Sequence, residues 1–499
     1  MKLKLIGHDE KYALEQSLLT LFPGERPVYG EIAPEDARWA AVTMTETAGE
    51  VTFTTELSAD GKAARCSYSC PLSGDDYERE GQRRHALGLS FFGAAREALG
   101  VAPPWGSLTG VRPTKVALAA LREGGREHAE RVLAETYCVT PERRRLAIEA
   151  AEAGQRAADA LRPDEISLYV GIPFCPTRCA YCSFVAQSVE KTFAMVEPYL
   201  DALCAEIAAA GEMVRDTGLR IKSFYMGGGT PTTLTAPQMD RLLAALEAAF
   251  DFSGLAELTI EAGRPDTITA EKLAVLKAHD VTRLSVNPQS MNDAVLAAIG
   301  RRHTAEDIRR AMALVGEAGF PHVNMDLIAG LSEDTPESFR ASLDECLTMG
   351  ADNITVHTLS LKKGSRITLE GTRIPGGDEV AEMLDYANAA LRTHGYAPYY
   401  LYRQKYMSGS FENVGWTLPG AESLYNIYIM EELHGILSLG AGGSTKMVGR
   451  TAGGDALIRR CFNAKFPKEY IERGEKWRAN LAEFAAFYQT QKTLWRAMT

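Results

Sequence analysis

Short apolar segments alternate with amphipathic segments through the middle of the chain, and this pattern predicts regular strands and helices. Strands are predicted at residues 166–172, 223–226, 258–261, 283–287, 323–329 and 353–359. Helices are predicted at residues 196–213, 236–250, 270–279, 292–299, 305–318, 336–349 and 379–394. Six strand–helix units in succession are typical of parallel strands with right-handed crossovers. We therefore expect an α/β fold, a partial (β/α)6 TIM-like barrel over residues 161–395.

The regions on either side of the barrel follow other patterns. The pattern in residues 1–160 indicates a separate α+β domain. It predicts strands at 2–6 and 40–45, a hairpin formed by 50–57 and 63–68, and helices at 77–99, 116–122 and 141–161. After residue 395 the alternation stops. Residues 398–406 are aromatic and basic, residues 422–439 are ambiguous between strand and helix, and residues 467–499 are helical. We expect residues 396–499 to form a C-terminal region that covers the substrate.

The amino-acid composition and net charge limit the classes of protein to which the chain can belong. Hydrophobic residues make up 45% and charged residues 24% of the 499 residues, which is the balance of a soluble globular protein. The net charge of -11 argues against nucleic acid as a partner, because such partners need a basic face. The chain has no signal peptide and no apolar run long enough to span a membrane. Nine cysteines without a secretory signal predict reduced thiols in the cytoplasm.

Polar and glycine residues follow the predicted strands where each strand ends. In chain order they are three cysteines, Gly227-Gly-Gly-Thr-Pro-Thr232, Glu261, Asn287-Pro-Gln289, Asp326 and His357-Thr-Leu-Ser360. Because active sites of such barrels lie at the carboxyl ends of the strands, we expect these groups to converge on one rim.

The cysteines after the first strand indicate a metal site. Cys175, Cys179 and Cys182 form a C-x3-C-x2-C run. Zinc is the main competitor, but zinc sites usually show two ligand pairs, and no second pair follows at the required spacing. An iron–sulfur cluster normally takes four thiolates. Either a fourth ligand comes from elsewhere, or one iron stays open for a ligand that is not protein.

The remaining rim residues suit a polar ligand. Glycines let a backbone approach a ligand closely, and the Gly227 run lacks the Gly-Lys-Ser/Thr of a phosphate-binding P-loop. A carboxylate such as Glu261 or Asp326 suits ribose hydroxyls or an ammonium group. Gln289 offers a donor and an acceptor, and Arg301 is able to bind a carboxylate bidentately.

These motifs resemble a known family. Cys175-x3-Cys179-x-Tyr181-Cys182 resembles the radical S-adenosylmethionine signature. Residues 169–174, 227–232 and Asp326-Leu-Ile-Ala-Gly-Leu331 are similar to the oxygen-independent coproporphyrinogen III oxidase group. The N-terminal region, with Leu108-Thr-Gly-Val-Arg-Pro-Thr-Lys115, and Gly440-Ala-Gly-Gly-Ser-Thr-Lys446 resemble its HemZ, or coproporphyrinogen dehydrogenase, branch.

The resemblance implies a cofactor set and a reaction. A reduced [4Fe–4S] cluster cleaves S-adenosylmethionine to methionine and a 5′-deoxyadenosyl radical. The radical abstracts a hydrogen from a propionate of coproporphyrinogen III, and loss of carbon dioxide and an electron leaves a vinyl group. Repetition gives protoporphyrinogen IX, in porphyrin and haem biosynthesis. The partners implied are a porphyrinogen substrate and an electron donor such as flavodoxin or ferredoxin.

The resemblance also assigns residues. It gives the cluster to Cys175, Cys179 and Cys182, and contacts to a first S-adenosylmethionine to Tyr169, Gly228 and Glu261, with Tyr169 as the candidate catalytic residue. Contacts to a possible second S-adenosylmethionine fall to Tyr181, Gly229, Thr230, Gln289, Arg301, Asp326 and Ser360. The chain departs from the family pattern at Gly171, where relatives have histidine.

Two other functions stay open at this point. The same family contains haem chaperones with the same signature, and a radical enzyme with a different substrate would show the same motifs. Arg403 and Lys405 are candidates for holding the propionates.

Overall fold

The computed structural model describes residues 1–22, 25–100, 103–182, 187–360, 373–404, 411–451 and 453–498. The chain divides into two compact units. One consists of Met1–Ile148 with Tyr402–Glu412, and the other of Glu149–Leu401 with Asn413–Thr499. The division into three domains at residues 160 and 395 stays a prediction. Within the described residues, no helix is both long and apolar enough to cross a membrane.

The N-terminal unit is built on a five-stranded sheet in the order β2-β1-β3-β4-β5. Its elements are β1 (Lys2–Ile6), α1 (Lys11–Leu21), β2 (Val28–Tyr29), β3 (Trp39–Thr47), β4 (Glu50–Ala59), β5 (Lys62–Pro71), α2 (Asp76–Leu99), α3 (Pro113–Arg131) and the first part of α4 (Pro141–Asp159). Alternate residues of β4 are buried, and Phe53 and Leu57 pack in one core with Phe91 of α2. The predicted hairpin forms as β4 and β5, joined through Asp60 and Gly61, which both have positive φ.

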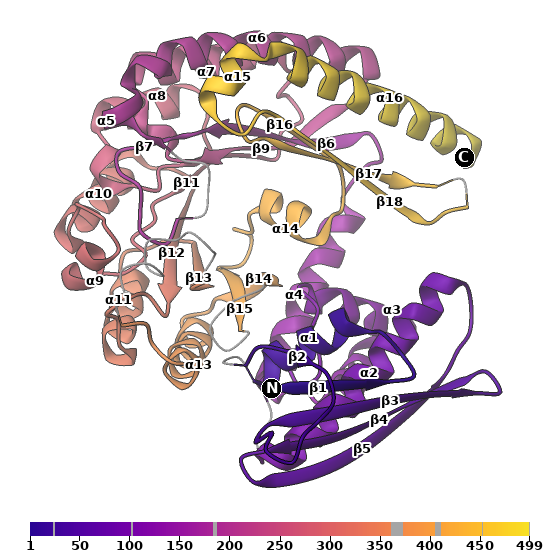
Figure 1. Cartoon of the computed structure of the whole chain (residues 1–499). Coiled ribbons are helices and arrows are strands. Elements are labelled where there is room, and N and C mark those ends of the chain that lie inside the picture. The colour runs from indigo at the N-terminus through magenta and orange to yellow at the C-terminus, as the bar shows by residue number, and fades with distance from the viewer. Residues whose placement is uncertain are drawn as a thin grey trace. The chain divides into compact units, whose positions relative to one another are not determined.

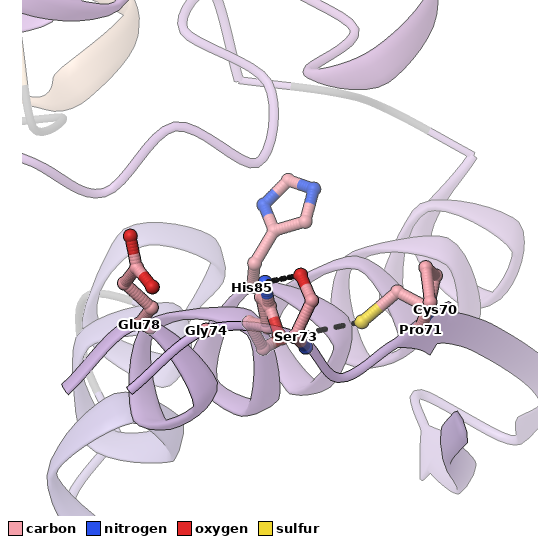
Figure 2. Close-up of a pocket in the computed structure, with 8 residues that line it drawn as sticks. Cys70, Pro71, Ser73, Gly74, Glu78 and His85 are labelled. Carbon is pink, nitrogen blue, oxygen red and sulfur yellow. Dashed lines mark hydrogen bonds between the residues drawn. The ribbon is translucent and has the colours of Figure 1, made fainter. Parts of the chain in front are cut away.

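Two thiols of this unit lie on β5 without forming a disulfide. A hollow of about 570 Å³ lies beside Cys70, whose Sγ donates to the carbonyl of Gln82 at 3.5 Å. Figure 2 shows residues that line it, among them Cys70 and His85. Cys66 and Cys70 are both free, and burial raises the pKa of each thiol. These cysteines therefore behave as ordinary thiols of a sheet packed against a helix.

The second unit contains the predicted barrel. In the described residues its main sheet has eleven strands in the order β14-β15-β13-β12-β11-β10-β9-β6-β16-β17-β18. The parallel strands are β6 (Glu165–Ile172), β9 (Arg220–Gly228), β10 (Glu257–Glu261), β11 (Arg283–Ser285), β12 (His322–Ala329) and β13 (Asn353–Thr358). They lie side by side in chain order, which confirms the six parallel strand–helix units of the predicted partial barrel.

The helices that follow these strands lie along the outside of the curved sheet (Figure 1). They are α6 (Val196–Thr217), α7 (Ala236–Ala249), α8 (Ala270–Ala278), α9 (Asp293–Ala298), α10 (Ala305–Ala318), α11 (Pro336–Thr348) and α13 (Gly377–Thr393), with the short α5 (Val189–Thr192) after the two-stranded pair β7 (Phe174–Cys175) and β8 (Gln187–Ser188). Side chains at their N-caps fix where several begin. Thr235 and Gln238 form a reciprocal capping box on α7, and Thr304 and Asp307 form another on α10.

The two faces of the parallel strands differ in chemistry. Apolar residues such as Leu168, Phe224 and Leu258 occupy neighbouring register positions and are buried on the helix side. The alternate positions carry polar groups instead: Ser167, Tyr169, Ser223, Tyr225, Glu257, Thr259, Glu261, Arg283, Ser285, Asn324, Asp326, Asn353, Thr355 and His357. Because TIM barrels fill this inner face mainly with branched apolar side chains, a polar inner face indicates a lumen built for a ligand.

The C-terminal region contributes strands that the hydrophobic pattern did not predict. β14 (Ala397–Arg403) and β15 (Glu412–Thr417) extend the sheet beyond β13, and β16 (Ile436–Leu439) pairs in parallel with β6. β17 (Ser444–Arg450) and β18 (Ala456–Phe462) complete that edge, before α15 (Pro467–Glu472) and α16 (Gly474–Met498). α14 (Leu424–Glu431) lies on the inner side of the sheet (Figure 1). The segment predicted as ambiguous is therefore a helix followed by a strand.

Candidate active site

The cysteine loop begins where β6 ends and is held by backbone hydrogen bonds at both of its ends. Gly229 N donates to the carbonyl of Ile172 at 2.7 Å, and Thr230 N donates to that of Phe174 at 2.8 Å. Near the other end, Ala180 N donates to the carbonyl of Ile299 at 2.9 Å. The glycine run after β9 thus fixes the start of the cysteine loop.

Gly229 is a glycine because the two segments lie too close for a side chain. A Cβ there would stand 2.5 Å from the carbonyl oxygen of Phe174 and 2.7 Å from that of Ile172. Such backbone contacts are far below van der Waals separation, so any side chain would push the turn away from the cysteine loop. The neighbouring Gly228 has a φ of 103°, which also favours glycine.

The three cysteines suit an iron–sulfur cluster. Cys175, Cys179 and Cys182 are all free thiols and are partly buried. Cys175 Sγ lies 3.4 Å from Thr230 Oγ1, and burial raises the pKa of this thiol to about 11, above its usual range. A bound cation would favour the thiolate instead. Three such donors on one short loop fit a cluster, in which each thiolate binds a different iron.

A site for a single metal ion is not formed. Within the described parts of the chain, no three His, Cys, Asp or Glu side chains are grouped to hold one ion. This holds for the cysteine run as well, so the preference for a cluster over zinc rests on the sequence, where no second ligand pair follows at zinc-site spacing.

Glu261 lies at the end of β10, in contact with the glycine run and the inner face. Its carboxylate accepts a short hydrogen bond from the Tyr225 hydroxyl, and a Cβ at Gly227 would lie 2.8 Å from Oε2. Burial raises the pKa of Glu261 to about 7, although the bonds from Tyr225 and Gly228 act in the opposite direction. Near neutral pH this carboxyl group is therefore poised between its charged and neutral forms.

Three stacked tyrosines line the inner face of the sheet next to Glu261. Tyr169 of β6 stacks on Tyr225 of β9 with ring centroids 6.3 Å apart, and Tyr225 stacks on Tyr425 of α14 at 4.5 Å. Aromatic pairs of this kind contribute about 0.5–1.5 kcal/mol beyond their burial. The stack fixes the Tyr169 ring beside the start of the cysteine loop.

A second group of predicted residues is joined by hydrogen bonds. Tyr181 donates to Gln289 Oε1 at 3.0 Å, and Arg301 Nη2 donates to the Tyr181 hydroxyl at 3.3 Å. Arg301 also donates to the carbonyl of Asn287 at 2.6 Å. Gln289 has a φ of 70°, and its backbone N–H donates to the carbonyl of Asp326 at 2.9 Å. Tyr181, Gln289, Arg301 and Asp326, which the resemblance assigns to a second S-adenosylmethionine, are therefore connected.

Asp326 and Ser360 complete the predicted set on the far strands. Asp326 Oδ1 accepts a bond from Asn324 at 2.8 Å, and its other oxygen lies 3.8 Å from His357 Nε2. Ser360 is half-buried and lies two residues after the end of β13. The structure thus places Asp326 and His357 together on the inner face.

Several residues that shape the site were not predicted. Tyr225 was detectable, because Ser167-x-Tyr169-x-Gly171 recurs on the next strand as Ser223-x-Tyr225-x-Gly227. Tyr425 gave no local signal, since it reaches the site only through the position of α14.

The C-terminal turn after β16 packs against Gly171, where the chain departs from the family pattern. The Tyr199 hydroxyl donates to the Gly171 carbonyl at 2.6 Å and accepts from Ala441 N at 3.0 Å. A Cβ at Gly171 would already lie 3.4 Å from the Ala441 carbonyl oxygen and 3.5 Å from that of Leu439. These are ordinary van der Waals distances, so the turn after β16 contacts Gly171 without excluding a larger residue there.

Arg403 and Lys405 were the two basic residues expected to hold the propionates of the substrate, and the structure describes one of them. Arg403 is only 6% exposed and belongs to the N-terminal unit, where its guanidinium donates to the Leu108 carbonyl and lies 5.7 Å from the Trp105 ring centroid. This buried, bonded position is inconsistent with a substrate contact. Lys405 lies outside the described residues.

Comparisons with known proteins agree with this geometry. Residues 169–346 match the family model of the Radical SAM superfamily. The chain is 38% identical to the oxygen-independent coproporphyrinogen-III oxidase-like protein HemZ of Bacillus subtilis, over 96% of both chains. It is 32% identical to the heme chaperone HemW of Lactococcus lactis, over 57% of this chain and 70% of that relative.

A solved structure shows the same fold. The coproporphyrinogen III oxidase HemN of Escherichia coli, described as a radical SAM enzyme, superposes with a TM-score of 0.50 and 24% identity. The match covers 65% of this chain and 72% of that one.

Proposed function

The chain belongs to the radical S-adenosylmethionine superfamily, in the group of HemZ-type oxygen-independent coproporphyrinogen III oxidase-like proteins, and on this basis we propose that it oxidatively decarboxylates coproporphyrinogen III. Members of the superfamily use a [4Fe–4S] cluster and S-adenosylmethionine. The proposed product is protoporphyrinogen IX, in which two propionates have become vinyl groups. The main support for the proposal is the three-cysteine loop, which backbone hydrogen bonds hold at the end of β6, where the inner face of the sheet is polar. It occurs in a chain that is 38% identical to HemZ over 96% of its length.

The residues of the loop and the first rim strands are proposed to hold the cofactors. Cys175, Cys179 and Cys182 would bind three irons, which leaves one iron open for S-adenosylmethionine. When bound, the cluster and S-adenosylmethionine would supply the radical chemistry that removes a hydrogen atom from a propionate. Tyr169, Gly228 and Glu261 would position S-adenosylmethionine. The glycine backbone gives close approach, and the Glu261 carboxylate accepts hydrogen bonds from an amine or from ribose hydroxyls.

The connected group on the later strands is proposed to bind the next ligand in the lumen. Tyr181, Gln289, Arg301 and Asp326 present a hydroxyl, an amide, a guanidinium and a carboxylate in fixed positions. With Gly229, Thr230 and Ser360, they are the residues expected to contact a second S-adenosylmethionine. Groups held this way cost little ordering entropy when a ligand binds.

The lumen is also proposed to keep the radical away from water. The stacked rings of Tyr169, Tyr225 and Tyr425 would limit the access of water to the cofactors on this side of the lumen. An outside protein such as flavodoxin or ferredoxin would supply the electron. Free thiols at all nine cysteines fit the reducing cytoplasm as the place of action.

Turnover under anaerobic conditions tests the proposal. Reconstituted protein with dithionite, S-adenosylmethionine and coproporphyrinogen III should form protoporphyrinogen IX. Cys179→Ala should lose the brown cluster absorbance and all product. A Cys179→Ala protein with a full cluster would refute the cluster assignment.

A haem chaperone is the second candidate, and the 32% identity to HemW favours it. Haem binding by the wild-type protein without porphyrin turnover would support this function. Formation of 5′-deoxyadenosine with no porphyrin product would instead indicate a radical enzyme with another substrate.

A further inference from the structure

A buried arginine contacts the cysteine loop from the turn that follows β10. Arg264 is 3% exposed and lies directly before the short helical turn η4 (Pro265–Thr267). Its Nη1 donates to Thr177 Oγ1 at 3.0 Å and to the Thr177 carbonyl at 3.4 Å. Thr177 stands two residues from Cys175 and two residues from Cys179. The guanidinium therefore bonds the middle of the segment that separates two of the proposed cluster ligands.

Asp266 fixes the direction of this guanidinium. Arg264 Nε donates to Asp266 Oδ1 at 3.0 Å and Nη2 donates to Oδ2 at 2.9 Å, so the pair is bidentate. With Nη1 on Thr177, each nitrogen of the guanidinium has a partner. A planar group held at all three nitrogens has little freedom left, so the loop segment that it bonds is held as well.

The turn that carries Arg264 is itself tied to the glycine run after β9. Thr267 N donates to the Arg264 carbonyl at 3.0 Å, and Thr267 Oγ1 lies 2.6 Å from Thr232 Oγ1. Lys272 Nζ donates to the carbonyls of Thr232 and Thr267 at 2.6 and 3.0 Å. Because the same glycine run bonds the start of the cysteine loop, one framework holds the loop at its start and at its middle.

The Arg264–Asp266 pair presents its positive end to the loop. The Asp266 side chain is 30% exposed and that of Arg264 only 3%, so water screens the carboxylate more than the guanidinium. His303 Nδ1 lies 3.6 Å from Asp266, and burial lowers the pKa of this histidine, so it is neutral at pH 7. A buried ion pair adds little net stability compared with apolar side chains of the same size, so stability alone does not explain one at this position.

We propose that Arg264 is a positioning residue for the cluster, which holds the cysteine loop through Thr177 and places a buried positive charge beside it. The inference rests on the proposed function. Reduction makes a cluster more negative by one charge, and the reduction potential of a cluster depends on the charges and hydrogen bonds around it. The Arg264 charge would therefore favour the reduced form, and Asp266 would moderate this effect.

The midpoint potential of the reconstituted cluster tests the role of the charge. In an anaerobic redox titration followed by cluster absorbance, Arg264→Gln should have a lower potential than the wild type. Asp266→Asn leaves the arginine charge uncompensated, so its potential should be higher, by a smaller amount because the carboxylate is better screened. A general loosening of the loop would not shift the two variants in opposite directions.

Release of iron to a chelator tests the role of position separately. Thr177→Val removes the hydroxyl that accepts from Arg264 and leaves both charges in place. Arg264→Lys keeps the positive charge but loses the bidentate geometry. Both variants should release iron about tenfold faster than the wild type, the size of loss typical of removing a partner of a metal ligand, while their potentials stay near the wild-type value.

A second buried arginine provides a matched control. Arg143 of the N-terminal unit is also 3% exposed and also pairs with a carboxylate, that of Glu412 at 3.0 Å. Arg143→Gln breaks a buried ion pair of the same kind away from the cysteine loop in the chain. Its potential and its rate of iron release should equal those of the wild type.

The possible failures are distinguishable. Wild-type potentials in Arg264→Gln and Asp266→Asn, or shifts of both in the same direction, would overturn the proposed charge effect. Wild-type iron release from Thr177→Val and Arg264→Lys would overturn the positioning role. If Arg264→Gln takes up no iron, the potential of Asp266→Asn and the iron release of Thr177→Val decide, and wild-type values for both would refute the proposal. A wild-type protein that takes up no cluster would instead overturn the proposed function.

Discussion

Binding of S-adenosylmethionine should depend on pH through Glu261. Burial raises the pKa of this carboxyl group to about 7 from a reference value of 4.5, so it takes up a proton just below neutral pH. Only the charged form is a strong acceptor for the amine of the ligand. We therefore predict tighter binding as the pH rises through 7, and loss of this dependence in Glu261→Gln.

The size of the effect follows from the ionised fraction. With a pKa of about 7, roughly one-tenth of the Glu261 carboxyl groups are charged at pH 6 and roughly nine-tenths at pH 8. If binding requires the charged form, affinity rises about tenfold between these values, or about 1.4 kcal/mol. Glutamine keeps the size of the side chain and still accepts the bond from Tyr225, so the variant isolates the charge.

Anaerobic calorimetry of S-adenosylmethionine binding to both cluster-loaded proteins at pH 6, 7 and 8 measures this. The amino group of the ligand also titrates, at a pKa of about 7.7–8.0. Because that contribution is common to both proteins, the ratio of their dissociation constants is the informative quantity. A ratio that stays the same from pH 6 to pH 8 would refute the role of the Glu261 charge.

Three further predictions concern the cysteine loop and the two cores. Gly229→Ala should lose most of its reconstituted iron, because the new methyl group would meet two carbonyls of the loop, whereas Gly254→Ala, which meets no atom within 4 Å, should keep a full cluster. Glu412→Ala should lower the free energy of unfolding by about 3–5 kcal/mol in urea titrations, because it removes the buried carboxylate that pairs with the Arg143 guanidinium at 3.0 Å, and a loss under 1 kcal/mol would contradict this. His434 has a pKa lowered to about 3 by burial, so the unfolded chain binds a proton there below about pH 6.5 that the folded chain does not. Stability should therefore fall on acidification by up to about 1.4 kcal/mol per pH unit, and His434→Gln should reduce that slope.

The barrel could be predicted from the sequence because its local signals agree with its tertiary structure. Helices such as α7 and α10 carry both an apolar stripe and a capping box, so their starts were placed within one residue. The strands between them have apolar residues on the helix side. Local and global preferences coincide here, and the order of the parallel strands followed from the connection rules.

The C-terminal strands could not be predicted in the same way. β16 has only four residues, and all of them are buried, so it shows no alternation of apolar and polar positions. A short apolar run of this kind is indistinguishable from part of a helix. Its place beside β6 is set by tertiary pairing, as is that of α14 against the tyrosine stack.

The residues of the site that lie at the ends of the strands could be predicted from the sequence. Glu261, Gln289 and Asp326 come from separate strands, and their arrangement follows from the rule that active sites lie at one end of a barrel. Their partners were not predictable, since the bond from Tyr225 to Glu261 and that from Tyr181 to Gln289 depend on side-chain positions. Arg403 shows where a local pattern misleads. It is a basic residue in an aromatic segment and was a candidate substrate contact, but its side chain is buried in a core.

Turnover of coproporphyrinogen III under strict anaerobiosis, with porphyrin product and 5′-deoxyadenosine measured together, tests the central claim most directly. Our account predicts protoporphyrinogen IX, with one 5′-deoxyadenosine formed for each propionate converted to a vinyl group, and no product from Cys179→Ala. Tight haem binding by a cluster-loaded protein that forms 5′-deoxyadenosine without any change in the porphyrinogen would contradict it.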